Sequence, residues 1–173
     1  MIASGFCVAM ARYNEWMNRR LYALCATLTD AERRHDRGAF FKSIHGTLDH
    51  IVYADLAFLS RFTGDPAEVP PLGVELYGDY AELRAVRATL DTRIEVWTSA
   101  LTPEWLAGAL TYTSKVDAKS RTVARWLLVA HLFNHQTHHR GQVTTLLSQR
   151  GLDLGSTDLP FMEAYSAPAE QTR

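Results

Sequence analysis

Apolar residues recur at steps of three and four along four long stretches of the chain, and this pattern restricts the fold more than any other feature. In the first stretch, Phe6 to Leu28, the steps are 4, 3, 4, 4, 3 and 4. Such spacing places the apolar side chains on one face of an α-helix. Similar patterns predict further helices over residues 40–62, 78–101 and 122–150. The sequence therefore predicts an all-α protein.

The connections between these helices differ in length and composition. Residues 63–77 carry three prolines and two glycines, which predicts a long crossover loop that lets the next helix start at the far end of the bundle. Thr29 and Asp30 are suited to cap a turn before a polar loop at 32–38. Alternating residues at 109–121 predict a short strand or hairpin, and Gly151 suits the end of the last helix.

Four of the seven histidines lie between residues 131 and 139, on the last predicted helix. Residues four apart share a helix face, and a histidine pair at that spacing can converge on one metal ion roughly 2 Å from each nitrogen. His135 and His139 fill the gap in the apolar stripe Leu128, Leu132, Val143 and Leu146. His131 and His138 belong to a more polar row and are predicted to flank the site. The alternative is a surface cluster, or core histidines satisfied by hydrogen bonds.

A third metal ligand must come from another helix, since zinc-like ions usually take three or four. His50 is the candidate, because it lies in a row with the small residues Gly46, Ala54 and Ala57, where another helix can approach closely. His45 lies about 140° round the helix from His50 and is not expected to bind the same ion.

Asp55 is the one polar residue in the apolar stripe of the second helix. It has three possible roles: a general base, a hydrogen-bond partner of a ligand histidine, or a buried carboxylate paired with an arginine such as Arg140.

Charge and composition exclude several classes of function. The formal net charge is −1, so the chain lacks the field that attracts nucleic acid. It has no run of about 20 apolar residues, and its first 16 residues lack the basic region and long apolar core of a secretory leader, so a cytoplasmic protein without membrane association is expected. Cys7 and Cys25 would be about 27 Å apart in one helix and are not expected to pair. Gly-rich phosphate loops, a CxxC pair and a GxSxG elbow are absent. The whole chain, 1–173, is expected to form one domain with a frayed tail at 166–173.

Three patterns resemble those of a known family. They are ARYNEWMN near the N-terminus, SIHGTLDHIVYADLAFLSRF in the second helix, and HLFNHQTHHRGQ followed by GLDLGSTDLPF. The chain is identified by them as a member of the DinB-like (YfiT-type) metal-binding proteins. This resemblance implies a four-helix bundle with up-down-down-up connectivity, frequent homodimerisation, and a divalent metal ion, zinc or nickel, bound by His50, His135 and His139.

Three protein nitrogens would leave a coordination position open, which is typical of catalytic sites. Relatives in this family include thiol transferases and a thiol-dependent isomerase. The resemblance therefore implies a metal-dependent S-transferase that acts on a low-molecular-weight thiol and an electrophile. A metal-dependent hydrolase and a non-catalytic metal-binding or stress-related structural protein are the alternatives. Residues such as Tyr13, Trp16 and Tyr53 are expected to line the substrate pocket.

Overall fold

The computed structural model describes residues 1–65, 69–114 and 117–162. Four long helices dominate it: α1 (Ser4–Cys25), α3 (Ile44–Thr63), α4 (Tyr80–Ser99) and α6 (Arg125–Ser148). The shorter elements are α2 (Asp30–Arg34), α5 (Pro103–Ala107), the strands β1 (Ala109–Thr113) and β2 (Ser120–Ala124), and a final 3₁₀ turn (Leu159–Phe161). The predicted frayed tail at 166–173 lies outside the described residues.

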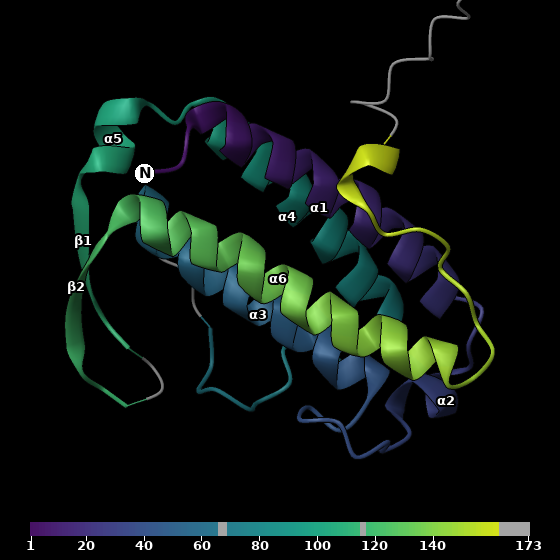
Figure 1. Ribbon diagram of the computed structural model, residues 1–173. Helices are drawn as coiled ribbons and strands as arrows, with labels where there is room; N and C mark the ends of the chain where they lie inside the picture. Colours follow the sequence, from purple (N-terminus) through teal and green to yellow (C-terminus); the bar gives the residue numbers. More distant parts are fainter. Residues whose placement is uncertain (66–68, 115–116, 163–173) are drawn as a thin grey trace, which may run out of the picture.

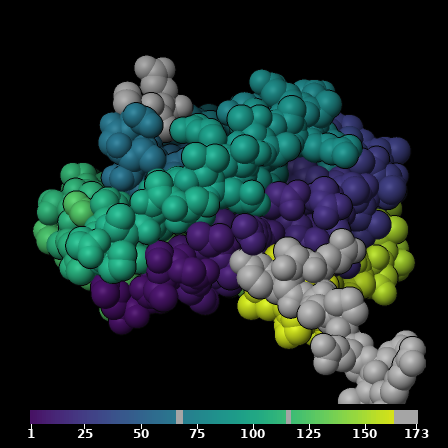
Figure 2. All heavy atoms as spheres, turned by 90° about the horizontal axis from the view of Figure 1, so that it is seen from above, coloured from purple at the N-terminus to yellow at the C-terminus, as the bar shows by residue number. Residues whose placement is uncertain are grey.

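The long helices form a bundle with up-down-down-up connectivity, as predicted (Figure 1). Helix α1 packs mainly on α4, and α3 packs mainly on α6. The segment between α3 and α4 returns along the bundle, so these two helices run in the same direction. Figure 2 shows α1 and α4 side by side on one face, with the segment that follows α6 lying against α1. No helix among the described residues has the length and apolarity needed to cross a membrane.

Local hydrogen bonds set the helix boundaries. The Ser43 side chain accepts from the Gly46 N–H, so α3 begins at Ile44 and not at residue 40 as predicted. Thr29 caps α2 through a capping box with Glu32, and α2 therefore occupies part of the predicted loop at 32–38. Gly64 ends α3 with a φ of 80°, a backbone conformation that favours glycine.

The predicted hairpin is present, and it shortens the last helix. Strands β1 and β2 pair antiparallel, with Ala109 opposite Ala124 and Thr113 opposite Ser120. Because residues 120–124 belong to this pairing, α6 begins at Arg125, three residues after the predicted start.

The core contains a buried polar network. The Arg87 guanidinium lies 2.5 Å from Asp55 and 2.8 Å from Asp91, and all three side chains are almost fully buried. Gln136 donates a hydrogen bond of 2.7 Å to Asp55. Asp55 is a buried carboxylate paired with an arginine, as one of the three predicted roles has it, but the arginine is Arg87 and not Arg140. Arg140 instead donates a hydrogen bond to Asn14 on α1. Asp55 is paired and inaccessible, so it serves neither as a general base nor as a partner of a candidate ligand histidine.

Candidate metal centre

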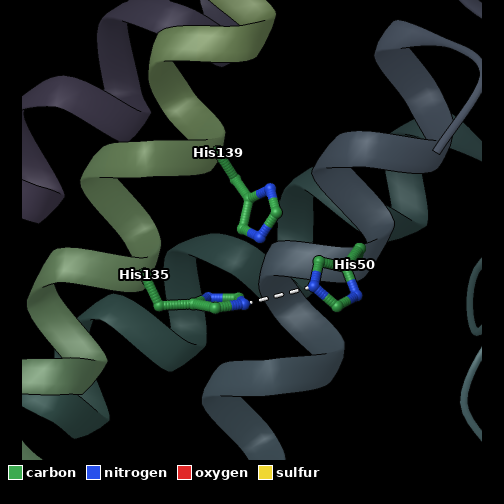
Figure 3. A group of neighbouring side chains, drawn as sticks. All are labelled: His50, His135 and His139. Carbon is green, nitrogen blue, oxygen red and sulfur yellow. Dashed lines mark hydrogen bonds between the residues drawn. The ribbon is translucent and has the colours of Figure 1, made fainter. Parts of the chain in front are cut away.

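Three histidines from two neighbouring helices meet in one place. His50 comes from α3, and His135 and His139 come from successive turns of α6 (Figure 3). One ring nitrogen from each lies within 4.8 Å of the other two. The described residues contain one such group of metal-ligating side chains, and it is the trio predicted from the sequence.

The distances are compatible with a tetrahedral ion. His50 Nε2 and His135 Nε2 are 3.2 Å apart. Two nitrogens at about 2.05 Å from a tetrahedral zinc-like ion would be separated by roughly 3.3 Å. His50 and His135 therefore already have the spacing of two ligands, and a shift of up to about 1.5 Å would bring a nitrogen of His139 to the same spacing.

Gln142 orients the third histidine. His139 Nδ1 lies 2.7 Å from Gln142 Oε1, so the ring donates its Nδ1 proton to the amide oxygen and leaves Nε2 as an acceptor. Hydrogen bonds of this kind fix the ring orientation and tautomer of metal-binding histidines. This role of Gln142 was not predicted from the sequence. Gln142 follows His139 by three residues on one helix, and this i, i+3 spacing is the sequence signal that could have identified the contact.

The three imidazoles are neutral at physiological pH. Burial, reinforced by the proximity of the other histidines, lowers the pKa of His50 to about 4 and that of His135 to about 3. Burial also lowers the pKa of His139, although the hydrogen bond to Gln142 opposes the shift. Only neutral imidazole has a free lone pair for a metal, so the site is ready to bind a cation without losing protons first.

Phe41 covers one side of the trio. Its ring stacks on His50 with centroids 3.7 Å apart and meets the ring of His139 edge-on at 5.5 Å. The loop before α3 reaches this position because residue 46 is glycine: a Cβ there would lie 2.5 Å from the Phe41 carbonyl oxygen. The sequence pattern places residue 41 only within the predicted helix at 40–62, because it does not specify how the loop before α3 folds back.

The remaining histidines have separate environments. The His131 ring lies 5.9 Å from His135 and 5.3 Å from Phe58, and His138 lies 4.8 Å from His139. Both line the cavity beside the trio, as the prediction of a flanking position implies. His45 is fully buried and donates from Nε2 to the Tyr77 carbonyl at 2.8 Å. It is a core histidine outside the trio.

A cavity of about 570 Å³ opens onto the three histidines. Its walls come from α3, α6, the β1–β2 hairpin and the loops near Phe40 and Leu72, and Tyr53 is among its lining residues as predicted. Tyr13 and Trp16 were wrongly predicted to line it. Both lie on α1, which packs mainly on α4, and the Tyr13 hydroxyl donates to the Thr157 carbonyl at 2.6 Å.

Comparisons with known proteins agree with this fold. The sequence profile of the DinB family matches residues 1–172. A curated relative, Protein DinB of Bacillus subtilis strain 168, is 24% identical over 159 residues, which cover 90% of this chain and 92% of that protein. The crystal structure of a DinB-like protein from Bacillus cereus ATCC 10987 superposes with a TM-score of 0.60 at 22% identity, covering 81% of this chain and 89% of that one.

Proposed function

Because this chain belongs to the DinB family, we propose that His50, His135 and His139 bind one divalent metal ion, zinc or nickel, in a catalytic site. We infer that the protein is a metal-dependent S-transferase, which joins a low-molecular-weight thiol to an electrophile. The observation that supports this most is the meeting of three neutral imidazoles at the wall of a cavity, with ring nitrogens within 4.8 Å of one another.

A three-nitrogen donor set suits this chemistry. When bound, a zinc- or nickel-like ion with an open position lowers the pKa of a thiol that coordinates it, so that the sulfur is held as thiolate at neutral pH. In the transfer step the sulfur forms a bond to the electrophilic carbon, and the leaving group departs with its electron pair. The thiol proton is released to solvent.

The protein's own residues position the reactants and restrict water. Gln142 holds the His139 ring in one tautomer, and Phe41 covers His50 with its aromatic face. Ala54, Ala57 and Phe58 give the cavity an apolar wall next to the histidines. A dry wall strengthens electrostatic interactions at the site and favours a thiolate over water as the nucleophile.

A conjugation assay tests this function. Protein reconstituted with zinc or nickel is mixed with cysteine, glutathione or coenzyme A and with a chloronitrobenzene electrophile. We expect turnover with at least one thiol, and loss of that turnover after chelation or in His139→Ala. His138→Ala is the matched control for metal content, because His138 is the adjacent histidine outside the trio, and Glu15→Gln, in an exposed ion pair on α1, is the control for turnover. Equal rates with and without metal would refute the transferase function.

The two alternatives give different results in the same experiment. A metal-dependent hydrolase would cleave nitrophenyl esters without any thiol, although Asp55 is buried away from the cavity and cannot serve as its base. A non-catalytic metal-binding protein would bind the ion and show neither activity.

Homodimerisation and a cytoplasmic location also belong to this proposal. Sedimentation equilibrium tests the first, with a mass of about twice the 19.5 kDa chain expected. Fractionation of the source cells tests the second.

A further inference from the structure

The cavity at the histidine trio continues along one face of α3. The α3 residues that line the cavity are His50, Tyr53, Ala54, Ala57, Phe58 and Arg61. His50 and Arg61 are eleven residues apart, which is three helical turns plus about 20°, so they share a face roughly 16 Å apart along the axis. The cavity therefore has histidines at one end and a guanidinium at the other.

Arg61 contacts two aromatic rings at the hairpin end of the cavity. Its guanidinium carbon is 4.8 Å from the ring centroid of Tyr112 on β1 and 5.3 Å from that of Phe58. The β1–β2 hairpin, which carries Tyr112, lies beside the C-terminal end of α3 (Figure 1). These two cation–π contacts hold the guanidinium in place and shield it in part from water.

No carboxylate within the described parts of the chain forms an ion pair with this guanidinium. Arg87 and Arg34, by contrast, each pair with two acidic residues. Arg61 is half-buried, and burial lowers its pKa. Partial removal of a cation from water without a counter-charge is unfavourable, and an anionic ligand in the cavity would supply that charge.

The space between the two ends suits an unbranched apolar segment. The small side chains of Ala54 and Ala57 leave space on the α3 side of the cavity, and Phe58 adds an apolar wall. A volume of about 570 Å³ accommodates a molecule of drug-like size. The Arg61 guanidinium lies over the ring of Phe58, three residues nearer to His50, which shortens the span to about 10–15 Å.

We propose that Arg61 binds the anionic end of an elongated substrate whose sulfur lies at His50, His135 and His139. The proposal deepens the function above and rests on it for the position of the reactive end. It narrows the substrate to thiols that carry a carboxylate about 10–15 Å from the sulfur, with a largely apolar segment between. Guanidinium recognises carboxylate through two parallel hydrogen bonds, which a neutral hydroxyl does not reproduce.

The test uses matched thiols with cobalt-substituted protein. Mercaptooctanoic acid and mercaptooctanol differ only in the terminal group, which is a carboxylate or a hydroxyl. Mercaptopropionic acid and mercaptopropanol differ in the same way, but their chains are too short to reach Arg61. Each thiol is titrated while the visible cobalt spectrum is recorded. We expect the long acid to bind about 10- to 100-fold more tightly than the long alcohol, and the short pair to bind alike.

Variants of Arg61 connect this preference to the side chain. Arg61→Met should abolish the advantage of the long acid, whereas Arg61→Lys should keep part of it. Cobalt content and helical circular dichroism should be unchanged in both, since Arg61 is three turns away from His50. Equal affinities for the long acid and alcohol, or an advantage that survives in Arg61→Met, would overturn the proposal.

A second measurement separates this proposal from the thiol chemistry. Octanoate, which has no sulfur, is added while the arginine side-chain Nε–H signals are followed by ¹H–¹⁵N NMR. A shifted signal that is missing in Arg61→Met supports the anion subsite even if no thiol alters the cobalt spectrum. A thiol-dependent cobalt spectrum without acid preference and without an octanoate shift supports the transferase site and overturns the subsite.

Discussion

Replacement of Asp55 by asparagine should destabilise the protein strongly while leaving its metal content unchanged. Asp55 and Arg87 are 0% and 2% exposed at the side chain, with the carboxylate and guanidinium 2.5 Å apart. Arg87 also pairs with Asp91, and Gln136 donates to the same Asp55 oxygen that accepts from Arg87. The substitution would keep the side-chain volume but remove the negative charge from a site with almost no water to replace it.

The expected loss is about 3–5 kcal/mol, the range for breaking one partner of a buried ion pair. For a chain of this length that corresponds to a fall in melting temperature of roughly 10 °C. Urea unfolding followed by circular dichroism measures the free energy of unfolding. The slope of this free energy against urea concentration should be the same in the variant and the wild type. Glu15→Gln is the control, because it breaks an exposed pair with Arg19 and should change stability very little.

A double variant sharpens the result. In the double variant Asp55→Leu with Arg87→Met, both charges of this ion pair are removed together, so no charged partner of the pair remains. The loss in free energy of unfolding should therefore be clearly smaller than the sum of the two single losses. Additive losses, or an Asp55→Asn protein as stable as the wild type, would refute the reasoning. Loss of metal in Asp55→Asn at full helicity would instead assign Asp55 to the site.

Three further outcomes are expected. Gln142→Leu should weaken metal affinity about 10- to 100-fold in competition with a chelating dye, because the His139 ring loses its orienting acceptor; unchanged affinity would contradict this. The metal-free protein should lose stability as pH falls from about 6.5 toward 4. In this range the histidines of the unfolded chain bind protons, whereas buried His50 and His135 stay neutral in the folded protein because their pKa values are about 4 and 3. A urea midpoint that does not change over this range would count against it. Gly46→Ala should destabilise the protein by displacing the Phe41 loop, measured by thermal melting, and an unchanged melting temperature would disprove the close contact.

Much of the helical framework follows from periodicity alone. Steps of three and four identify all four long helices because each buries a continuous apolar stripe. The same stripe selects His135 and His139 over His131 and His138, and the small residues around His50 indicate a close helix contact. Proline and glycine content identifies the loop that makes α3 and α4 run in the same direction.

The features that sequence patterns missed depend on contacts between distant segments. The Phe41 stack requires the backbone of residues 39–42 to fold back on α3, and the partner of Asp55 depends on the rotation of α4, which places Arg87 where Arg140 was expected. Tyr13 and Trp16 were assigned to the cavity because periodicity gives the buried face of α1 but not the helix that it meets. Arg61 was missed because its significance comes from Tyr112, which the hairpin brings to it.

Metal content is the most direct test of the central claim. The protein is purified without chelators, and its zinc and nickel are measured by inductively coupled plasma mass spectrometry together with the His139→Ala and His138→Ala variants. The three-histidine site predicts close to one ion per wild-type chain, loss of that ion in His139→Ala, and retention in His138→Ala. Full retention in a folded His139→Ala protein would contradict the assignment of the site.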